Sequence, residues 1–326
     1  METATSSVPL HHRIRHLLFR LPMLTEFLIR HFTFVTLKEY YLSLFFFNSG
    51  LFPLTIDLDR DTSIHLWIPT HRNHRRIPLL LIHGFGGNSK WQWQKQIVSL
   101  SKSFDLYIPD LIFFGRSTTL SSDRSVEFQA QCFVETMRRL GVDKYAVCGI
   151  SYGGFVAFRM ADMAVKEVEK LVILTAGVCM TDKQKKEMVE REERDVIEIL
   201  LPQKGEDLME LLRRSMHRPP RWVPAFLLRD FIEVMYKDNR NERVDMLNEL
   251  LVNGASADSL PVLTQETLLI WGNQDNVFPT YLAHQLNSHL GKKSRLEIVK
   301  DAGHACQLEN PDSVNYLIEN FLLESN

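Results

Sequence analysis

The hydrophobic residues of the chain change their spacing near residue 54. From there on, short continuous apolar runs recur at regular intervals, separated by longer stretches with helical periodicity. Short, β-branched-rich apolar runs are typical of strands that are buried on both faces of a parallel sheet. Six such strands are predicted, at residues 77–82, 104–108, 145–150, 171–175, 267–271 and 296–299.

Two further strands precede these six and differ from them in pattern. Residues 54–58 and 64–68 alternate apolar with polar positions around a polar turn, which predicts an antiparallel hairpin. Alternating strands and helices imply right-handed crossovers and a doubly wound, mostly parallel sheet of eight strands. The helices predicted between the strands are residues 89–101, 125–140, 152–163, 281–290 and 311–322.

The interval between residues 175 and 267 interrupts this alternation, because it contains helical patterns and no convincing strand. We expect a helical cap at residues 179–262, inserted between two parts of an α/β core at residues 51–178 and 263–326. The helices predicted in this interval are residues 183–201, 206–216, 222–236 and 242–252.

The first fifty residues are basic and rich in aromatic side chains, and they predict a helical extension. Charged residues, among them Arg20, Arg30 and Lys38, interrupt every window long enough to span a membrane. A signal peptide would need an unbroken apolar stretch, which is absent. We predict a cytoplasmic protein. Three interpretations of the extension stay open: packing on the core, peripheral membrane contact through residues 10–50, and organelle targeting.

The composition narrows the classes of function. Hydrophobic residues make up 45% of the chain and charged residues 24%, as in ordinary globular proteins. There are 38 Lys and Arg residues against 40 Asp and Glu residues, so the basic excess expected of a nucleic-acid-binding protein is absent. The four cysteines have neither a CxxC pair nor zinc-ligand spacing, which predicts reduced thiols and no metal site.

The most informative motif is Gly-Ile-Ser-Tyr-Gly-Gly at residues 149–154, between a predicted buried strand and a predicted helix. The G-x-S-x-G pattern is weak alone, but in this position it indicates a sharp turn that exposes the serine. Side chains at Gly149 and Gly153 would collide with neighbouring backbone in such a turn. We therefore predict Ser151 as a nucleophile, with the Tyr152 backbone N–H at the helix N-terminus favouring an oxyanion.

A second glycine-rich segment, His-Gly-Phe-Gly-Gly at residues 83–87, directly follows a predicted strand. Its small residues allow the loop to bend towards Ser151, so the backbone N–H of Phe85 is the predicted second donor of an oxyanion hole. The Phe85 side chain is then free to face a substrate pocket. A phosphate-binding loop is the rival interpretation, but neither G-x-G-x-x-G nor a following Lys-Ser/Thr is present.

A serine hydroxyl needs a base that removes its proton as it attacks. His304 is the predicted base and Asp275 the carboxylate that orients its ring. Both follow predicted strands, at the edge where open parallel sheets place their sites. The order Ser, Asp, His along the chain fits this arrangement and differs from that of other serine hydrolases. Asp182 is the alternative acid.

With these motifs in this order, the chain resembles the α/β-hydrolase superfamily from about residue 51 to residue 323, specifically its cap-bearing esterase, lipase and carbon–carbon hydrolase branch. Residues 109–110 and 115–117 are similar to the loop after the family's fourth strand, in which Asp110 is expected to hold backbone N–H groups. The chain also resembles plant hydrolases with an apolar N-terminal extension. Haloalkane dehalogenases and epoxide hydrolases of this fold use an aspartate nucleophile, and position 151 is a serine.

These observations predict a serine hydrolase that cleaves a carboxylic ester through an acyl-enzyme and needs neither a metal nor an organic cofactor. Two alternatives stay open: hydrolysis of a carbon–carbon bond in a vinylogous diketone, and a ligand receptor on a hydrolase scaffold. The expected substrate is a small hydrophobic acyl or aromatic ester, and the oligomeric state is undetermined. The candidate pocket residues are Phe85, Phe226 and Met235, and Met209 and Phe231 are further apolar candidates from the cap.

Overall fold

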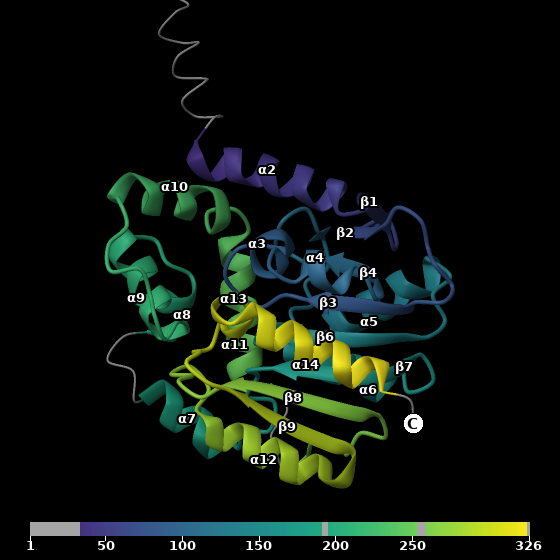
Figure 1. Ribbon diagram of the computed structural model, residues 1–326. Coiled ribbons are helices and arrows are strands. Elements are labelled where there is room, and N and C mark those ends of the chain that lie inside the picture. Colours follow the sequence, from purple (N-terminus) through teal and green to yellow (C-terminus); the bar gives the residue numbers. More distant parts are fainter. Residues whose placement is uncertain (1–32, 191–194, 253–258, 325–326) are drawn as a thin grey trace, which may run out of the picture.

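The structure is a computed structural model that describes residues 33–190, 195–252 and 259–324. Its centre is one mixed sheet with the strand order β1-β2-β4-β3-β6-β7-β8-β9 (Figure 1). β1 and β2 form an antiparallel hairpin, and β2 joins β4 antiparallel; all other neighbours on this path are parallel. The strands are β1 (Leu51–Asp57), β2 (Thr62–Pro69), β3 (Ile77–Ile82), β4 (Phe104–Pro109), β6 (Tyr145–Ile150), β7 (Val168–Leu174), β8 (Glu266–Gly272) and β9 (Ser294–Val299).

The predicted doubly wound sheet is confirmed. All eight strands predicted from the apolar pattern are present, and β3 and β6 have the predicted bounds. A further strand, β5 (Thr118–Thr119), pairs with β2 outside the main path. Two residues are too few to produce a periodic pattern, so β5 was not predicted.

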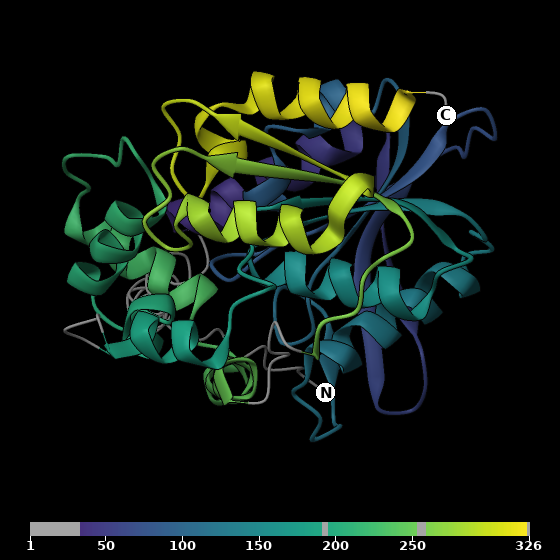
Figure 2. The same ribbon diagram turned by 90° about the horizontal axis from the view of Figure 1, so that it is seen from below.

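Helices cover both faces of the sheet, as Figure 2 shows for α14 on one side and α6 and α12 on the other. Leu79 and Leu81 of β3 pack in the cluster that includes α3, α4 and α14, whereas Leu80 and Ile82 pack in the cluster with α5, α6 and α12. Both sides of each central strand are therefore apolar, which explains the continuous apolar runs. These helices are α3 (Ser89–Trp93), α4 (Ile97–Leu100), α5 (Val126–Arg139), α6 (Tyr152–Met163), α12 (Thr280–Leu290) and α14 (Pro311–Leu323).

The single helix predicted at residues 89–101 is wrong in its continuity, because α3 ends at Trp93 and α4 begins at Ile97. Between them Gln96 turns inwards and is fully buried, and its Nε2 donates to the Gln307 carbonyl oxygen at 2.8 Å. The helix is therefore interrupted where the buried Gln96 side chain forms its hydrogen bond. The spacing of apolar residues before and after Gln96 does not predict this break.

Only helices join β7 to β8 in the part of this interval that the structure describes. They gather at one end of the sheet in both views (Figures 1 and 2). The predicted helix at residues 183–201 is divided into α7 and α8, and residues 191–194 lie outside the described residues. The helices are α7 (Asp182–Glu190), α8 (Val196–Leu200), α9 (Gly205–Ser215), α10 (Ala225–Met235) and α11 (Arg240–Val252).

The helix α2 (Phe34–Asn48) precedes the sheet and lies beside β1 and α10 (Figure 1). Val35, Leu42 and Phe46 are buried, and the Phe46 ring lies 5.2 Å from that of Trp67. The described part of the predicted extension therefore packs on the core, while residues 1–32 lie outside the described residues. None of the described helices is both long and apolar enough to cross a membrane.

Candidate active site

Ser151 lies at the junction of β6 and α6, where the chain turns sharply. Its φ of 54° is in the left-handed region, which costs a non-glycine residue energy and is common at functional sites. A Cβ atom on Gly149 would lie 2.1 Å from the Gly153 carbonyl oxygen, and one on Gly153 would lie 2.4 Å from that of Ile82. The close approach of backbone to backbone therefore requires both glycines, as the sequence predicts.

The loop at residues 83–87 approaches this turn closely. A Cβ atom on Gly84 would lie 2.8 Å from the Ser151 Cβ, so only glycine allows the approach. The Phe85 N–H donates no hydrogen bond to any described residue, and Tyr152 is the first residue of α6, whose N–H has no intrahelical partner. The two predicted oxyanion donors are thus on either side of Ser151.

Two side chains that the sequence did not reveal as positioning residues hold this loop. Gln92 on α3 donates to the carbonyl oxygens of Gly84 and Gly86, each at 2.8 Å, and accepts from the Gly84 N–H at 2.8 Å. The fully buried His83 accepts from the Leu111 N–H through Nε2 at 2.9 Å, and its Nδ1 lies 2.8 Å from the Gly84 carbonyl oxygen. Because an amide N–H only donates and a carbonyl oxygen only accepts, His83 is neutral and carries its proton on Nδ1.

His304 and Asp275 meet as predicted, at the ends of β9 and β8. The His304 Nδ1 lies 3.1 Å from the Asp275 Oδ2, and the Asp275 side chain is fully buried. The other Asp275 oxygen accepts from the N–H groups of Val277 and Phe278 at 2.8 and 2.9 Å. Asp182, the alternative acid, is exposed on α7 and pairs with Lys185, so it does not take this position.

The backbone around His304 is fixed by contacts from three other segments. The Thr175 hydroxyl donates to the His304 carbonyl oxygen at 3.0 Å, and the next N–H, of Ala305, donates to the Ser215 carbonyl oxygen on α9. Glu309 accepts from the N–H groups of Gly303 and His217 at 2.7 and 3.0 Å. The helices between β7 and β8 are therefore tied directly to the histidine loop.

Ser151 and His304 line one cavity of about 260 Å³, together with Phe85 and Phe231. Most of its surface is apolar and includes leucines of α9 and the Trp91 ring, while three glutamines, Ser215 and Tyr236 also line it. The cavity contacts no Lys, Arg, Asp or Glu among the described residues that line it. This interior suits an uncharged, hydrophobic ligand better than an anionic one.

Two of the three candidate pocket residues are outside this cavity. Phe226 is 61% exposed, because it lies five positions before Phe231 on α10 and therefore points away from it. Met235 is buried and lies one helical turn beyond Phe231. It lines a separate, more polar cavity, at which Asn88 also lies. Met209 also packs among the helices between β7 and β8 rather than against Ser151. Periodicity identified the apolar residues of these helices but not which of them face the serine.

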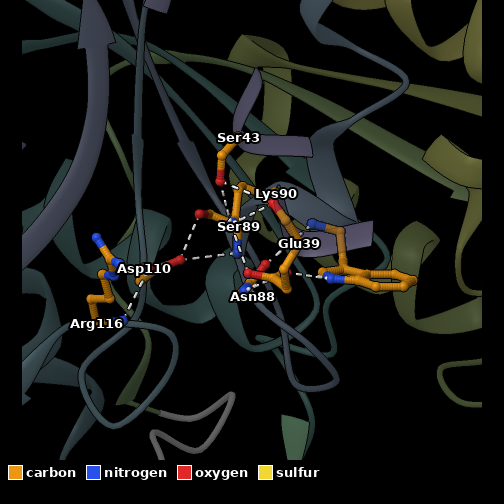
Figure 3. Close-up of polar contacts among 8 residues, drawn as sticks. Glu39, Ser43, Asn88, Ser89, Lys90, Asp110 and Arg116 are labelled. Atoms are coloured by element: carbon orange, nitrogen blue, oxygen red, sulfur yellow. Dashed lines mark hydrogen bonds and ion pairs between the residues drawn. The ribbon is translucent and has the colours of Figure 1, made fainter. Parts of the chain in front are cut away.

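A further polar cluster connects α2 to the residues behind the loop (Figure 3). Glu39 accepts from the indole N–H of Trp91 and from the Asn88 amide at 3.1 Å, and it pairs with Lys90 at 2.6 Å. Trp91 lines the cavity and its ring lies 5.0 Å from that of Phe231. Glu39 therefore holds one wall of the cavity from outside, a role for which the sequence shows no motif.

Asp110 has the architectural role that the resemblance implies. Its carboxylate accepts from the backbone N–H groups of Ser89 and Arg116, each at 3.1 Å, and it is 4% exposed (Figure 3). These bonds join the end of β4 to the start of α3. Among the described residues, no three His, Cys, Asp or Glu side chains are placed to hold a metal ion.

Comparison with known proteins agrees with this geometry. The family model described as "alpha/beta hydrolase fold" matches residues 77–311. The chain belongs to the α/β-hydrolase fold family. It is 27% identical over 237 residues to Lipase 3 of Moraxella sp., covering 71% of this chain and 73% of the lipase. It is 25% identical over 272 residues to 2-hydroxymuconate semialdehyde hydrolase of Pseudomonas sp., covering 78% of this chain and 90% of that hydrolase.

A solved structure shows the same fold over nearly the whole of this chain. A membrane phospholipase A described as a bacterial virulence factor superposes with a TM-score of 0.76 over 94% of this chain and 98% of that one, at 22% identity. At this identity the likeness concerns the fold alone. The relatives of this chain thus include a lipase, a methyl ester esterase and a hydrolase of 2-hydroxymuconate semialdehyde.

The serine turn predicts the effect of one added methyl group. Gly153→Ala places a Cβ against the backbone oxygens of Ile82 and His83, so we expect it to lower the free energy of unfolding by about 1–3 kcal/mol. Gly205→Ala is the control, since its nearest neighbour is the flexible Leu228 side chain at 3.2 Å. Urea denaturation measures both, and equal losses would contradict the backbone clash.

His83 predicts a dependence of stability on pH. Burial lowers its pKa from 6.5 to about 4, so the unfolded state binds more protons than the folded state between these values. The contribution of neutral His83 to the free energy of unfolding is fully present above pH 6.5. It is lost as the pH decreases towards 4, which lowers the free energy of unfolding by roughly 3 kcal/mol. Urea denaturation from pH 4.5 to 7 should show a shallower slope for His83→Asn than for wild type or the exposed control His284→Asn. Equal slopes for all three proteins would exclude His83 as the source.

The Glu39 cluster predicts a stability difference between two glutamates. Glu39→Ala leaves the Trp91 and Asn88 donors without their acceptor, so we expect a loss of about 1–3 kcal/mol. Glu135 forms an exposed ion pair with Arg139, and Glu135→Ala should change stability by only about 0.5 kcal/mol. Thermal and urea denaturation measure both variants. A Glu39→Ala variant with the stability of wild type would contradict the role of Glu39 as acceptor for Trp91 and Asn88.

Proposed function

We propose that the protein is a serine esterase that hydrolyses an uncharged carboxylic ester with a hydrophobic acyl or aromatic part. The observation that supports it best is the shared cavity, in which Ser151 on its strained turn and His304 on its buried Asp275 partner face the same space. Nucleophile, base and orienting acid are the three parts that such chemistry needs.

In the proposed first half-reaction, the Ser151 Oγ attacks the ester carbonyl carbon while the His304 Nε2 removes its proton. Asp275 holds the imidazole with Nδ1–H towards the carboxylate and stabilises the imidazolium that forms. The backbone N–H groups of Phe85 and Tyr152 donate to the carbonyl oxygen as it becomes an oxyanion. The C–O bond then breaks, and the alcohol leaves with the proton from His304.

In the second half-reaction, water replaces the alcohol. His304 removes a proton from the water as its oxygen attacks the acyl carbon of the Ser151 ester. Collapse of the second oxyanion releases the carboxylic acid and returns the proton to the Ser151 Oγ. No metal or organic cofactor takes part in the proposed sequence.

The cavity walls favour an ester over a vinylogous diketone acid. A dienoate substrate carries a carboxylate, and the described residues around Ser151 offer no Lys or Arg to pair with it. Leu211 lines this cavity and also a second, mostly apolar cavity next to Phe278, at which Lys185 and Arg214 lie as well. The preference for an ester therefore rests on the residues around Ser151 alone. Carbon–carbon hydrolysis is the second candidate, because one relative is named as a hydrolase of 2-hydroxymuconate semialdehyde.

We also propose that the esterase is cytoplasmic and meets membranes only at their surface, through the N-terminal segment of residues 10–50. α2 is the described part of this segment. The resemblance to plant hydrolases and the cap boundaries at residues 179–262 stay predictions.

The mechanism predicts the effect of removing one hydroxyl. Ser151→Ala should lower kcat/KM for p-nitrophenyl esters by roughly 10⁴-fold or more, because no other group attacks the carbonyl. Ser215→Ala is the matched control, since Ser215 lines the same cavity. A series of acyl chain lengths should show that longer apolar chains are preferred over acetate.

Three outcomes separate the alternatives. Unchanged hydrolysis by Ser151→Ala would contradict the mechanism outright. Turnover of a ring-cleavage dienoate in preference to every ester would favour carbon–carbon hydrolysis. Reaction with a fluorophosphonate without turnover of either substrate would indicate a receptor on a hydrolase scaffold.

A further inference from the structure

Both sides of α2 are apolar, but the residues that the structure describes cover only one of them. The inner side buries Val35, Leu42 and Phe46 against the body of the molecule. The opposite side, which we call the outer face of α2, consists of six apolar or aromatic residues that are each half or more exposed. They are Phe34, Leu37, Tyr40, Tyr41, Leu44 and Phe47.

These six residues form one continuous stripe. Their spacing of three and four positions places them on the same side of a helix with 3.6 residues per turn. A surface helix of a water-soluble domain normally turns polar residues to solvent. A helix that is apolar all round, with one side uncovered, marks an interaction or membrane surface.

The charges of α2 are arranged around this stripe. Its single acidic residue, Glu39, points inwards to Trp91, Asn88 and Lys90 (Figure 3). Its single basic residue, Lys38, holds its ammonium group 4.7 Å from the Tyr41 ring, at the margin of the stripe. The preceding residues 1–32 contain four Arg and two Glu. The outer face therefore offers apolar area with Lys38 at its margin, while the one carboxylate of α2 is turned inwards.

We propose that the outer face of α2 docks on the surface of a lipid bilayer that contains anionic lipids. The apolar side chains enter the boundary between headgroups and acyl chains, Tyr40 and Tyr41 lie at headgroup level, and Lys38 pairs with lipid phosphate. A helix of 15 residues is about 22 Å long, shorter than a hydrocarbon core of about 30 Å, so it lies in the interface.

The inner side of α2 places the candidate active site close to this surface. The Val35 N–H donates to Asp230 on α10 at 2.8 Å, and Glu39 holds Trp91. Both contacts lead to walls of the cavity, since Trp91 and Phe231 of α10 line it. Docking would therefore bring an apolar, ester-binding cavity next to a source of lipid esters. This inference rests on the proposed membrane location and is independent of the hydrolase chemistry.

The test is vesicle flotation of the full chain with phosphatidylcholine vesicles, with and without phosphatidylserine. The outer-face variant is Leu37→Gln/Leu44→Gln/Phe47→Gln. Its matched control changes three exposed apolar residues elsewhere, Leu120→Gln/Val165→Gln/Tyr316→Gln. We expect the outer-face variant to lower the binding constant about tenfold or more and the control to leave it unchanged. Lys38→Gln should remove part of the preference for phosphatidylserine.

Several outcomes would overturn the proposal. One is wild-type protein that does not float with either kind of vesicle. Another is an outer-face variant that binds as wild type does, which would assign binding to another part of the chain. A third is wild-type self-association in sedimentation velocity that the variant abolishes without any change in flotation, which would make a second copy the partner. Ser151→Ala should keep full vesicle binding. Wild type that hydrolyses soluble esters but does not float overturns this inference and the proposed membrane location, and leaves the proposed esterase chemistry standing.

Discussion

The structure depends on the close approach of backbone to backbone where β6 turns into α6. Ser151 adopts a left-handed conformation there, and the glycines at 149, 153 and 84 allow three chain segments to meet without side chains between them. Such a conformation is unfavourable by about 1–3 kcal/mol and persists only when the surroundings enforce it. The buried parallel strands supply that enforcement, because the Ser151 N–H is bonded to the Leu174 carbonyl oxygen of the neighbouring strand.

Around this turn, buried and half-buried polar side chains perform most of the positioning. Gln92 and His83 fix the loop that holds Phe85, and Glu309 fixes the loop that holds His304. Each uses hydrogen bonds to backbone groups, which are short and directional, so the loops gain rigidity that apolar packing alone would not provide. Glu39 on α2 also positions its neighbours through polar contacts, but it does so by accepting from side chains rather than from backbone groups.

Much of the fold and of the catalytic constellation could be predicted, because the signals were local. Apolar runs revealed the strands, and the three candidate catalytic residues each followed a strand end, so the topology brought them together. Pocket residues were predicted less well. Phe226 and Met235 are as apolar as Phe231. The rotation of α10 turns Phe226 away from the cavity, and the position of α10 along its own axis places Phe231 rather than Met235 at it. Gln92, Glu39 and Glu309 act through contacts that are remote in sequence or have no motif.

The proposed mechanism requires a covalent intermediate at the Ser151 oxygen, so the most direct measurement is mass spectrometry of the protein quenched during turnover of an activated ester. We expect an added acyl mass on the peptide that contains Ser151, because the serine forms the acyl-enzyme before water releases it. An acyl group on a different residue, or turnover by a Ser151→Ala protein, would contradict this mechanism.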